Sequence, residues 1–235
     1  MPLDPVIVAE LNAISTATLT TVLLKKGLRR VAMRGPTPFG AGLSKRIVGR
    51  AFTLRFIPAR EDLATPESWS SPRSTRAAIE TMEAGDVVVA DAMGLTGAGI
   101  FGDILCARMQ KRGLAGLVTD GALRDGAGVA ATSLPVWCAG LAAPPSIAEL
   151  TFVGWGEPIG CGGVAVTPGD VIVADGDGAV VIPEAYVSAV VAEAGEQERL
   201  EAWIMREVEK GAALPGLYPA DAATRARYAA EKGEG

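Results

Sequence analysis

The 235-residue chain contains no histidine. This absence excludes Ser-His-Asp and Cys-His catalysis, and it excludes the transition-metal sites that imidazole ligands build. Any acid–base chemistry must therefore come from carboxylates, lysine, tyrosine or water bound to a metal.

Cysteine is scarce, with only Cys106, Cys138 and Cys161. Their number is odd and their spacing matches no close metal-ligand pattern, so neither a disulfide framework nor a zinc site is predicted. Because no secretory leader is evident, we expect reduced thiols and a cytoplasmic protein.

Long apolar runs and an excess of basic residues are also missing. No stretch reaches the roughly 18 to 20 residues that a membrane helix needs, so we expect no membrane partner. Lysine and arginine total 22 against 27 aspartates and glutamates, for a net charge of −5. Phosphate backbones require a concentrated basic patch, so we expect no nucleic-acid partner either.

The hydrophobic content of 49% is enough to bury one substantial core. We predict a single domain over residues 1–235, with N-terminal helices at about 3–26 and a C-terminal helical extension at about 183–235. Ser15 is placed to cap the second N-terminal helix.

Apolar runs bounded by glycine and proline predict strands through the middle of the chain. Helical spacing predicts helices over Ser74 to Met82, Phe101 to Arg112 and Pro183 to Lys210. The strands are expected at Gly49 to Pro58, Asp86 to Ala90, Gly113 to Thr119, Pro135 to Ala139, Thr151 to Val153, Val164 to Thr167, Val171 to Ala174 and Ala179 to Ile182. This order favours an α/β layered sandwich.

The segment from Gly94 to Asp125 concentrates the chemistry. A glycine-rich stretch precedes the Phe101 helix, and its free N–H groups favour an anion. The following strand ends in a turn that carries a cation, Arg124, and a hard oxygen ligand, Asp125. The pattern predicts a site for an anionic substrate and a divalent metal.

The stretch GDILCARMQKRGLAGLVTDGALRD resembles the core of the RraA-like family, the relatives of the regulator of ribonuclease activity. Many of these are metal-dependent pyruvate aldolases that act on 4-hydroxy-4-methyl-2-oxoglutarate, and their signature is Asp, twenty residues, then Arg-Asp. Here residues 104–123 separate Asp103 from Arg124. The resemblance implies a layered α/β/β/α sandwich, the swivelling β/β/α domain, assembled as a homotrimer or homohexamer.

The resemblance also implies residue roles. Arg124 would grip the carboxylate and carbonyl oxygen of a small 2-oxo acid, and Asp125 would hold the metal, Mg²⁺ or Mn²⁺. The backbone N–H groups of Gly102, Asp103, Ile104 and Leu105 would donate to the pyruvyl carboxylate, while Asp103 orders water on the metal. The plain alternatives are a solvated Arg-Asp turn and an ordinary helix start.

Glu198 and Glu201 lie one turn apart in the predicted C-terminal helix, which by itself indicates only a solvated face. The aldolase relatives carry a similar pair, from which a glutamate of a neighbouring subunit completes the metal's water shell. Glu198 is the first candidate for that role and Glu201 the second.

The implied activity is retro-aldol cleavage of a 4-hydroxy-2-oxo acid, or decarboxylation of oxaloacetate. Two alternatives remain: a non-catalytic regulator that binds and inhibits a ribonuclease, and a sugar-acid lyase or dehydratase that uses the same site. Relatives that act as regulators generally lack the Arg-Asp pair. The loop over residues 59–72 matches no part of the aldolase pattern, and we expect it to shape substrate choice.

Overall fold

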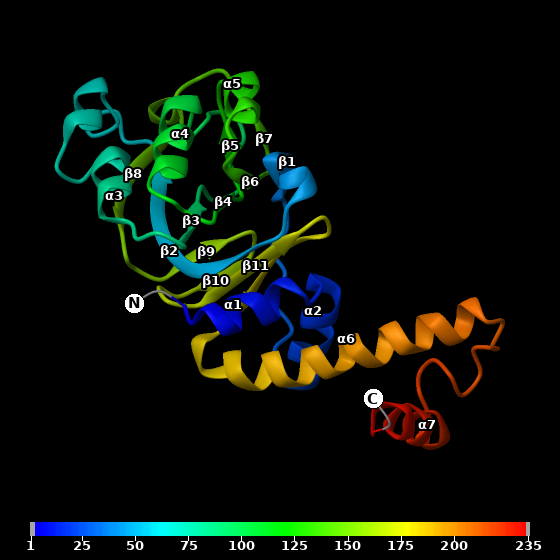
Figure 1. Ribbon diagram of the computed structural model, residues 1–235. Coiled ribbons are helices and arrows are strands. Elements are labelled where there is room, and N and C mark those ends of the chain that lie inside the picture. The colour runs from blue at the N-terminus through cyan, green and yellow to red at the C-terminus, as the bar shows by residue number, and fades with distance from the viewer. Residues whose placement is uncertain (1–2, 234–235) are drawn as a thin grey trace.

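The computed structural model describes residues 3–233, which form a strongly curved sheet with helices on both sides (Figure 1). The sheet has eight strands, and β8 pairs with β2 beside the main path. In spatial order the main path is β1 (Thr37–Gly40), β6 (Pro135–Cys138), β4 (Gly116–Thr119), β3 (Val87–Asp91), β2 (Ile47–Pro58), β11 (Val171–Asp175) and β12 (Gly178–Ile182). β8 spans Leu150–Trp155.

The long strand β2 joins the two halves of this sheet. Residues Ala51 to Arg55 run parallel to β3, whereas residues Ile47 to Arg50 pair antiparallel with β11. β3, β4 and β6 are parallel to one another. Their carboxyl ends therefore meet at one edge, where α/β sheets present functional loops.

Side-chain alternation along the strands separates the layers. Val88 and Ala90 of β3 pack in a cluster with α3 (Thr75–Thr81), α4 (Asp103–Lys111) and α5 (Gly126–Ala131). Val87 and Val89 face the opposite way, into a cluster shared with β11, β12 and the hairpin of β9 (Ile159–Cys161) and β10 (Val164–Val166). A third cluster joins the outer face of β11 and β12 to α1 (Pro5–Asn12), α2 (Thr16–Lys25) and α6 (Val187–Glu209). These layers confirm the predicted α/β/β/α sandwich.

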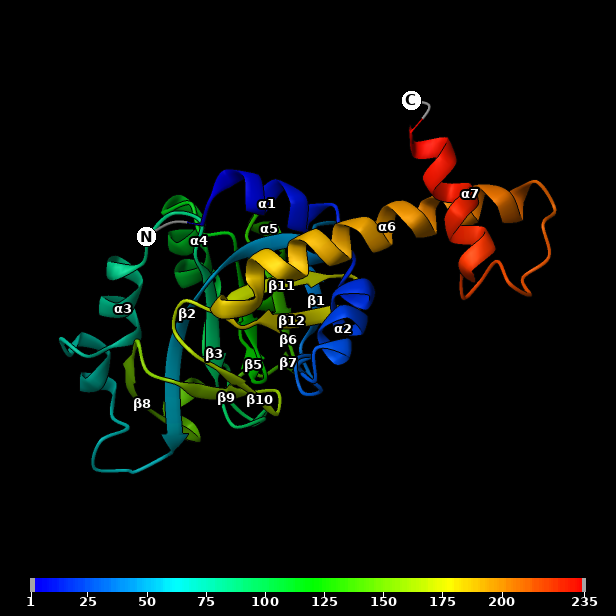
Figure 2. The same ribbon diagram turned by 90° about the horizontal axis from the view of Figure 1, so that it is seen from below.

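Only the first part of α6 packs on the sheet. Its residues Val187 to Ala194 belong to the cluster with α1 and α2, whereas Leu200, Trp203 and Ile204 pack in a separate cluster with Leu217. Figures 1 and 2 show α6 projecting from the body and α7 (Ala222–Gly233) crossing it near its far end. Residues 200–233 are called the arm below.

Several short elements were not predicted from the sequence. Among them are β1, β5 (Ala122–Leu123), β7 (Gly140–Leu141), β9 and α5. The β1 sequence TPFG contains proline and glycine, which are typical of a break between elements. Two or three residues are too few to show a strand period, and the α5 sequence GAGVAA has too few large apolar residues to show a helical one.

No single helix within residues 3–233 is long and apolar enough to cross a membrane. α1 and α2 pass that test together by length and composition, but they are bent by 104°. Leu11, Leu19 and Leu23 of this pair are fully buried in the protein's own core.

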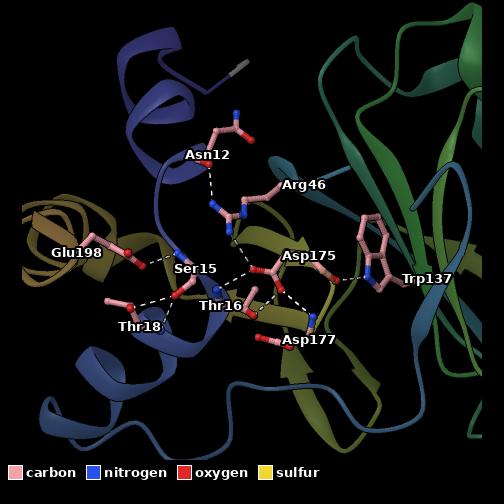
Figure 3. Close-up of polar contacts among 9 residues, drawn as sticks. All are labelled: Asn12, Ser15, Thr16, Thr18, Arg46, Trp137, Asp175, Asp177 and Glu198. Carbon is pink, nitrogen blue, oxygen red and sulfur yellow. Dashed lines mark hydrogen bonds and ion pairs between the residues drawn. The ribbon is translucent and has the colours of Figure 1, made fainter. Parts of the chain in front are cut away.

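Buried Asp175 ties α2 to the sheet (Figure 3). It ends β11, and its carboxylate accepts hydrogen bonds from the Thr16 N–H at 2.9 Å and the Thr16 hydroxyl at 2.6 Å. The Asp177 N–H and Arg46 Nη2 add donors at 3.0 and 3.3 Å. Burial would raise the pKa of Asp175, but the hydrogen bonds from Thr16 and Asp177 outweigh it and leave the pKa lowered.

We predict that Asp175→Asn lowers the free energy of unfolding at pH 7 by about 1–3 kcal/mol, because a charged acceptor of several hydrogen bonds is lost. The folded-state pKa of Asp175 is lowered, so its stabilisation is present above the unfolded pKa and is lost as the pH falls through the folded value. The difference from wild type, measured by urea unfolding, should shrink below about pH 4.

Asp177→Asn is the matched control, since that side chain is exposed on the same turn. It should leave stability unchanged within about 0.5 kcal/mol. Equal stability of Asp175→Asn and wild type at pH 7 would contradict the role given to Asp175.

Candidate active site

Six predicted residues line one cavity of about 190 Å³, which suits a small organic acid. It lies where the amino end of α4 meets the turn after β5. The six residues are Gly102, Asp103, Ile104, Leu105, Arg124 and Asp125. The structure therefore brings together both ends of the Asp, twenty residues, Arg-Asp pattern.

Arg124 is held against the segment before α4. Its N–H donates to the Phe101 carbonyl at 2.9 Å, and a Cβ added at Gly99 would stand 2.7 Å from the Arg124 nitrogen. Only glycine at position 99 permits this approach. The Arg124 side chain is 38% exposed, so its guanidinium remains accessible from the cavity.

Arg124 has unused donor capacity. Its Nε lies 3.5 Å from Asp125 Oδ2, close enough for an ion pair but without hydrogen-bond geometry. Within residues 3–233, the buried Nε atom has no hydrogen-bond partner. A planar carboxylate or 2-oxo group would satisfy such a fork.

Asp125 adopts a left-handed conformation, with φ 54° and ψ 42°. Besides Met93, it is the only residue other than glycine with positive φ in the described chain. Such backbone strain gathers at functional sites. Although Asp125 precedes α5, its side chain does not cap that helix. Its Oδ2 instead lies against Gly102, where an added Cβ would be 2.6 Å away.

Asp103 begins α4 and orders the amino end of the helix. Its Oδ1 accepts the Ile104 N–H at 2.7 Å, and its Oδ2 lies against Gly128. The first helical bond runs from the Cys106 N–H to the Gly102 carbonyl at 3.0 Å. Among residues 3–233, the N–H groups of Gly102, Asp103 and Leu105 have no hydrogen-bond acceptor. Three of the four predicted N–H donors are thus open to an anion, whereas the Ile104 N–H already donates to Asp103.

The donor set suits a hard, hydrated cation. Asp103 and Asp125 supply two carboxylates to one cavity, and the described residues contain no cluster of three or more metal-ligating side chains. Mg²⁺ is commonly bound through one or two carboxylates, with water and substrate oxygens filling the other positions. The residues present fit such an ion.

Neither predicted glutamate lines this cavity. Glu198 accepts the Ser15 N–H at 2.8 Å, at the amino end of α2 and in the opposite helical layer (Figure 3). Burial would raise the pKa of Glu198, but hydrogen bonds from Ser15 and Thr18 outweigh it and lower the pKa. Glu201 lies on the arm and accepts Gln197 Nε2 at 2.6 Å. Delivery of either to a neighbouring subunit's site stays a prediction.

The cavity also contains residues that the motif did not identify. Trp69 and Arg76 line it from the 59–72 loop and from α3, with the Arg76 guanidinium carbon 5.4 Å from the Trp69 ring centroid. The sequence offered one signal, a tryptophan in a loop without a match to the aldolase pattern. Nothing in the local sequence indicated that Arg76 meets it at the cavity.

Comparison with known proteins agrees with this fold. The family model RraA-like, described as Aldolase/RraA, matches residues 16–181. The chain therefore belongs to the RraA-like family.

One similar curated protein is named "Putative 4-hydroxy-4-methyl-2-oxoglutarate aldolase", from Halalkalibacterium halodurans. It is 39% identical over 117 residues, which cover 48% of this chain and 54% of the relative. The chain thus spans about half the length of that relative.

Solved structures cover more of the chain. Streptomyces coelicolor RraAS2, titled an unusual member of the RNase ES inhibitor RraA protein family, is 36% identical with a TM-score of 0.76, covering 86% of this chain and 97% of that one. An uncharacterized protein from Pseudomonas syringae pv. tomato has a TM-score of 0.79 at 24% identity, covering 93% and 99%. The second likeness bears on the fold alone.

We predict that Gly102→Ala disables the cavity without unfolding the protein, because the added methyl group displaces the half-exposed Asp125 side chain. In the presence of Mg²⁺, the affinity for pyruvate measured by titration calorimetry should fall by about tenfold or more. Gly140→Ala is the control, since a Cβ there meets nothing within 4 Å. Unchanged pyruvate affinity in Gly102→Ala would contradict this prediction, because it would show that pyruvate binding does not depend on the present position of the Asp125 side chain.

Proposed function

We propose that this protein is a divalent-metal-dependent pyruvate aldolase. It cleaves a 4-hydroxy-2-oxo acid such as 4-hydroxy-4-methyl-2-oxoglutarate, and the same site decarboxylates oxaloacetate. The observation that carries this proposal is the convergence of Arg124, Asp125 and the open N–H groups of α4 in one cavity. Similarity to a relative whose name includes that aldolase activity supports it.

The amino end of α4 binds the substrate carboxylate. The N–H groups of Gly102, Asp103 and Leu105 lack acceptors among the described residues, and the helix dipole favours negative charge at this end. Arg124 then donates to the 2-oxo oxygen. As the bond between C3 and C4 breaks, electrons move onto that oxygen, and the fixed guanidinium stabilises the developing charge.

Asp125 is the residue that would hold the metal, which is Mg²⁺ or Mn²⁺. When bound, a divalent cation supplies Lewis-acid polarisation of the 2-oxo group. With its left-handed backbone, Asp125 directs its carboxylate towards Gly102 and does not cap α5. Apart from the 3.5 Å ion pair between Oδ2 and Arg124 Nε, its oxygens have no partner among the described residues.

Asp103 is the other carboxylate of the cavity, and it can order the water that takes the proton of the 4-hydroxyl group as the C4 carbonyl forms. Its Oδ2 accepts no hydrogen bond from the described residues. Cys106 lies one turn further along α4 but cannot serve. Burial, with the Asp103 charge as a smaller cause, raises the pKa of the Cys106 thiol to about 12. The thiol stays protonated at neutral pH and is neither a base nor a nucleophile.

A ribonuclease regulator is the second candidate function, because RraAS2 is similar over nearly its whole length and its title names an RNase inhibitor family. Docking on a nuclease gives no reason for an Arg-Asp pair beside open helix N–H groups. The aldolase proposal explains those features, so we place it first.

The proposal is tested by pyruvate release from oxaloacetate and from 4-hydroxy-2-oxo acids. Wild type should release pyruvate with Mg²⁺ present and lose this activity on chelation. Arg124→Lys should lower kcat/KM by about 100-fold or more, because an ammonium keeps the charge but loses the two-pronged geometry. Arg55→Lys is the control and should retain activity, because Arg55 is an exposed β2 residue that does not line the cavity. Full turnover by Arg124→Lys would contradict the site assignment.

The neighbouring-subunit glutamate is better assigned to Glu201 than to Glu198. Glu198 already accepts the N–H of Ser15, the residue that caps α2 of its own chain. Glu201 lies on the arm, near exposed Met205, Leu214 and Tyr218. An exposed apolar patch of this kind suits burial against another subunit. A homotrimer or homohexamer then lets the arm of one subunit complete the cavity of the next.

We predict that Glu201→Gln lowers kcat by about tenfold or more with an unchanged unfolding midpoint. Glu198→Gln should do the reverse, lowering stability while retaining kcat, because it weakens the α2 cap. Coexpressed Arg124→Ala and Glu201→Gln chains should regain activity, since some mixed sites then contain both intact groups. Full activity in Glu201→Gln alone, or no recovery in the mixed assembly, would contradict the shared site.

A further inference from the structure

Arg76 is a cation without an acidic partner inside the candidate site. It lies at the second position of α3 and is exposed, and no carboxylate within residues 3–233 forms an ion pair with it. Its guanidinium carbon lies 5.4 Å from the centroid of the Trp69 ring, a cation–π contact. Both side chains line the cavity that contains Arg124 and Asp125.

The acid that would normally neutralise Arg76 is engaged elsewhere. Glu80 follows it by four residues on α3, the spacing at which helical ion pairs form. Arg108 instead binds Glu80 through two hydrogen bonds of 2.8 and 2.7 Å, and Arg112 adds a third at 3.1 Å. Arg76 is therefore left with its charge directed to the cavity.

Neighbouring arginines on this side of the molecule are already satisfied. Arg60 pairs with Asp62 at 2.6 Å, and Arg73 donates to the Val153 carbonyl at 3.1 Å. α3 thus places one guanidinium without an ion-pair partner at the cavity, and its cation–π contact with Trp69 of the 59–72 loop favours some orientations of the guanidinium over others. A planar guanidinium at this position is suited to bind a second carboxylate of the substrate, in addition to the carboxylate that binds at the amino end of α4.

We propose that Arg76, oriented by Trp69, binds the carboxylate at the far end of the substrate and so selects 2-oxo dicarboxylates over 2-oxo monocarboxylates. This inference rests on the proposed function, in which the pyruvyl end of the substrate lies at Arg124 and α4. Arg76 is a specificity-determining residue. It contacts the fragment that leaves and takes no part in the electron movement at the 2-oxo oxygen.

Two unreactive probes test the inference separately from catalysis. Pyruvate carries one carboxylate and 2-oxoglutarate carries two, and titration calorimetry with Mg²⁺ gives their affinities for the intact protein. Wild type should prefer 2-oxoglutarate by roughly tenfold, since a charge-assisted pair contributes at that level. Arg76→Gln should erase this preference while leaving the pyruvate affinity and the unfolding midpoint unchanged.

Arg73→Gln is the matched control, because it removes a neighbouring exposed guanidinium from the same segment. It should keep the 2-oxoglutarate preference. If Arg76→Gln retains the preference, if wild type shows none, or if the preference disappears in Arg73→Gln instead, the assignment to Arg76 is overturned.

Kinetics separate this inference from the proposed function. For a cleavable dicarboxylate, Arg76→Gln should raise KM about tenfold at nearly constant kcat, while turnover of a monocarboxylate 4-hydroxy-2-oxo acid is unaffected. Lack of any turnover by wild type would reject the aldolase, but the binding preference would still decide the role of Arg76. An active wild type with unchanged kinetics in Arg76→Gln would reject Arg76 alone.

Discussion

The close approach of the Arg124-Asp125 turn to the amino end of α4 is the constraint on which the site depends. Glycine at positions 99 and 102 permits it, because a side chain at either would collide with the turn. At that distance, open helix N–H groups, a guanidinium and two carboxylates share one small cavity. In the proposed function, substrate binding, charge stabilisation and metal binding would all depend on this single contact, since each would require groups from both segments.

The layered fold positions that contact, and it also places some acidic residues at the cavity and others where they stabilise a helix. Parallel β3, β4 and β6 direct their connecting loops to one edge, where α4 and the turn after β5 meet. The opposite helical layer has a structural task, with Asp175 and Glu198 fixing the amino end of α2. An acid already used as a cap is poorly placed to serve a neighbouring subunit. For this reason we propose Glu201, on the projecting arm, rather than Glu198 as the glutamate that reaches a neighbouring subunit's cavity.

Features that depend on residues close together in the sequence could be predicted from it. Ser15 was predicted to cap the second N-terminal helix by short-range rules, and its side chain accepts the Thr18 N–H there. The spacing from Asp103 to Arg124 could be interpreted because the intervening segment is short and holds only α4, β4 and β5. The contact between Arg76 and Trp69 could not be predicted from the sequence, because it depends on how the 59–72 loop packs against α3. The left-handed conformation of Asp125 could not be predicted either, because a turn residue other than glycine has no clear sequence signature for positive φ.

The most direct measurement is a crystal structure of the protein with Mg²⁺ and oxalate, a planar analogue of the pyruvate enolate. The account predicts oxalate oxygens within hydrogen-bond distance of Arg124 and of the N–H groups at the start of α4, with Asp125 holding the metal. Oxalate and metal bound elsewhere, or a metal in this cavity without contact to Asp125, would contradict it.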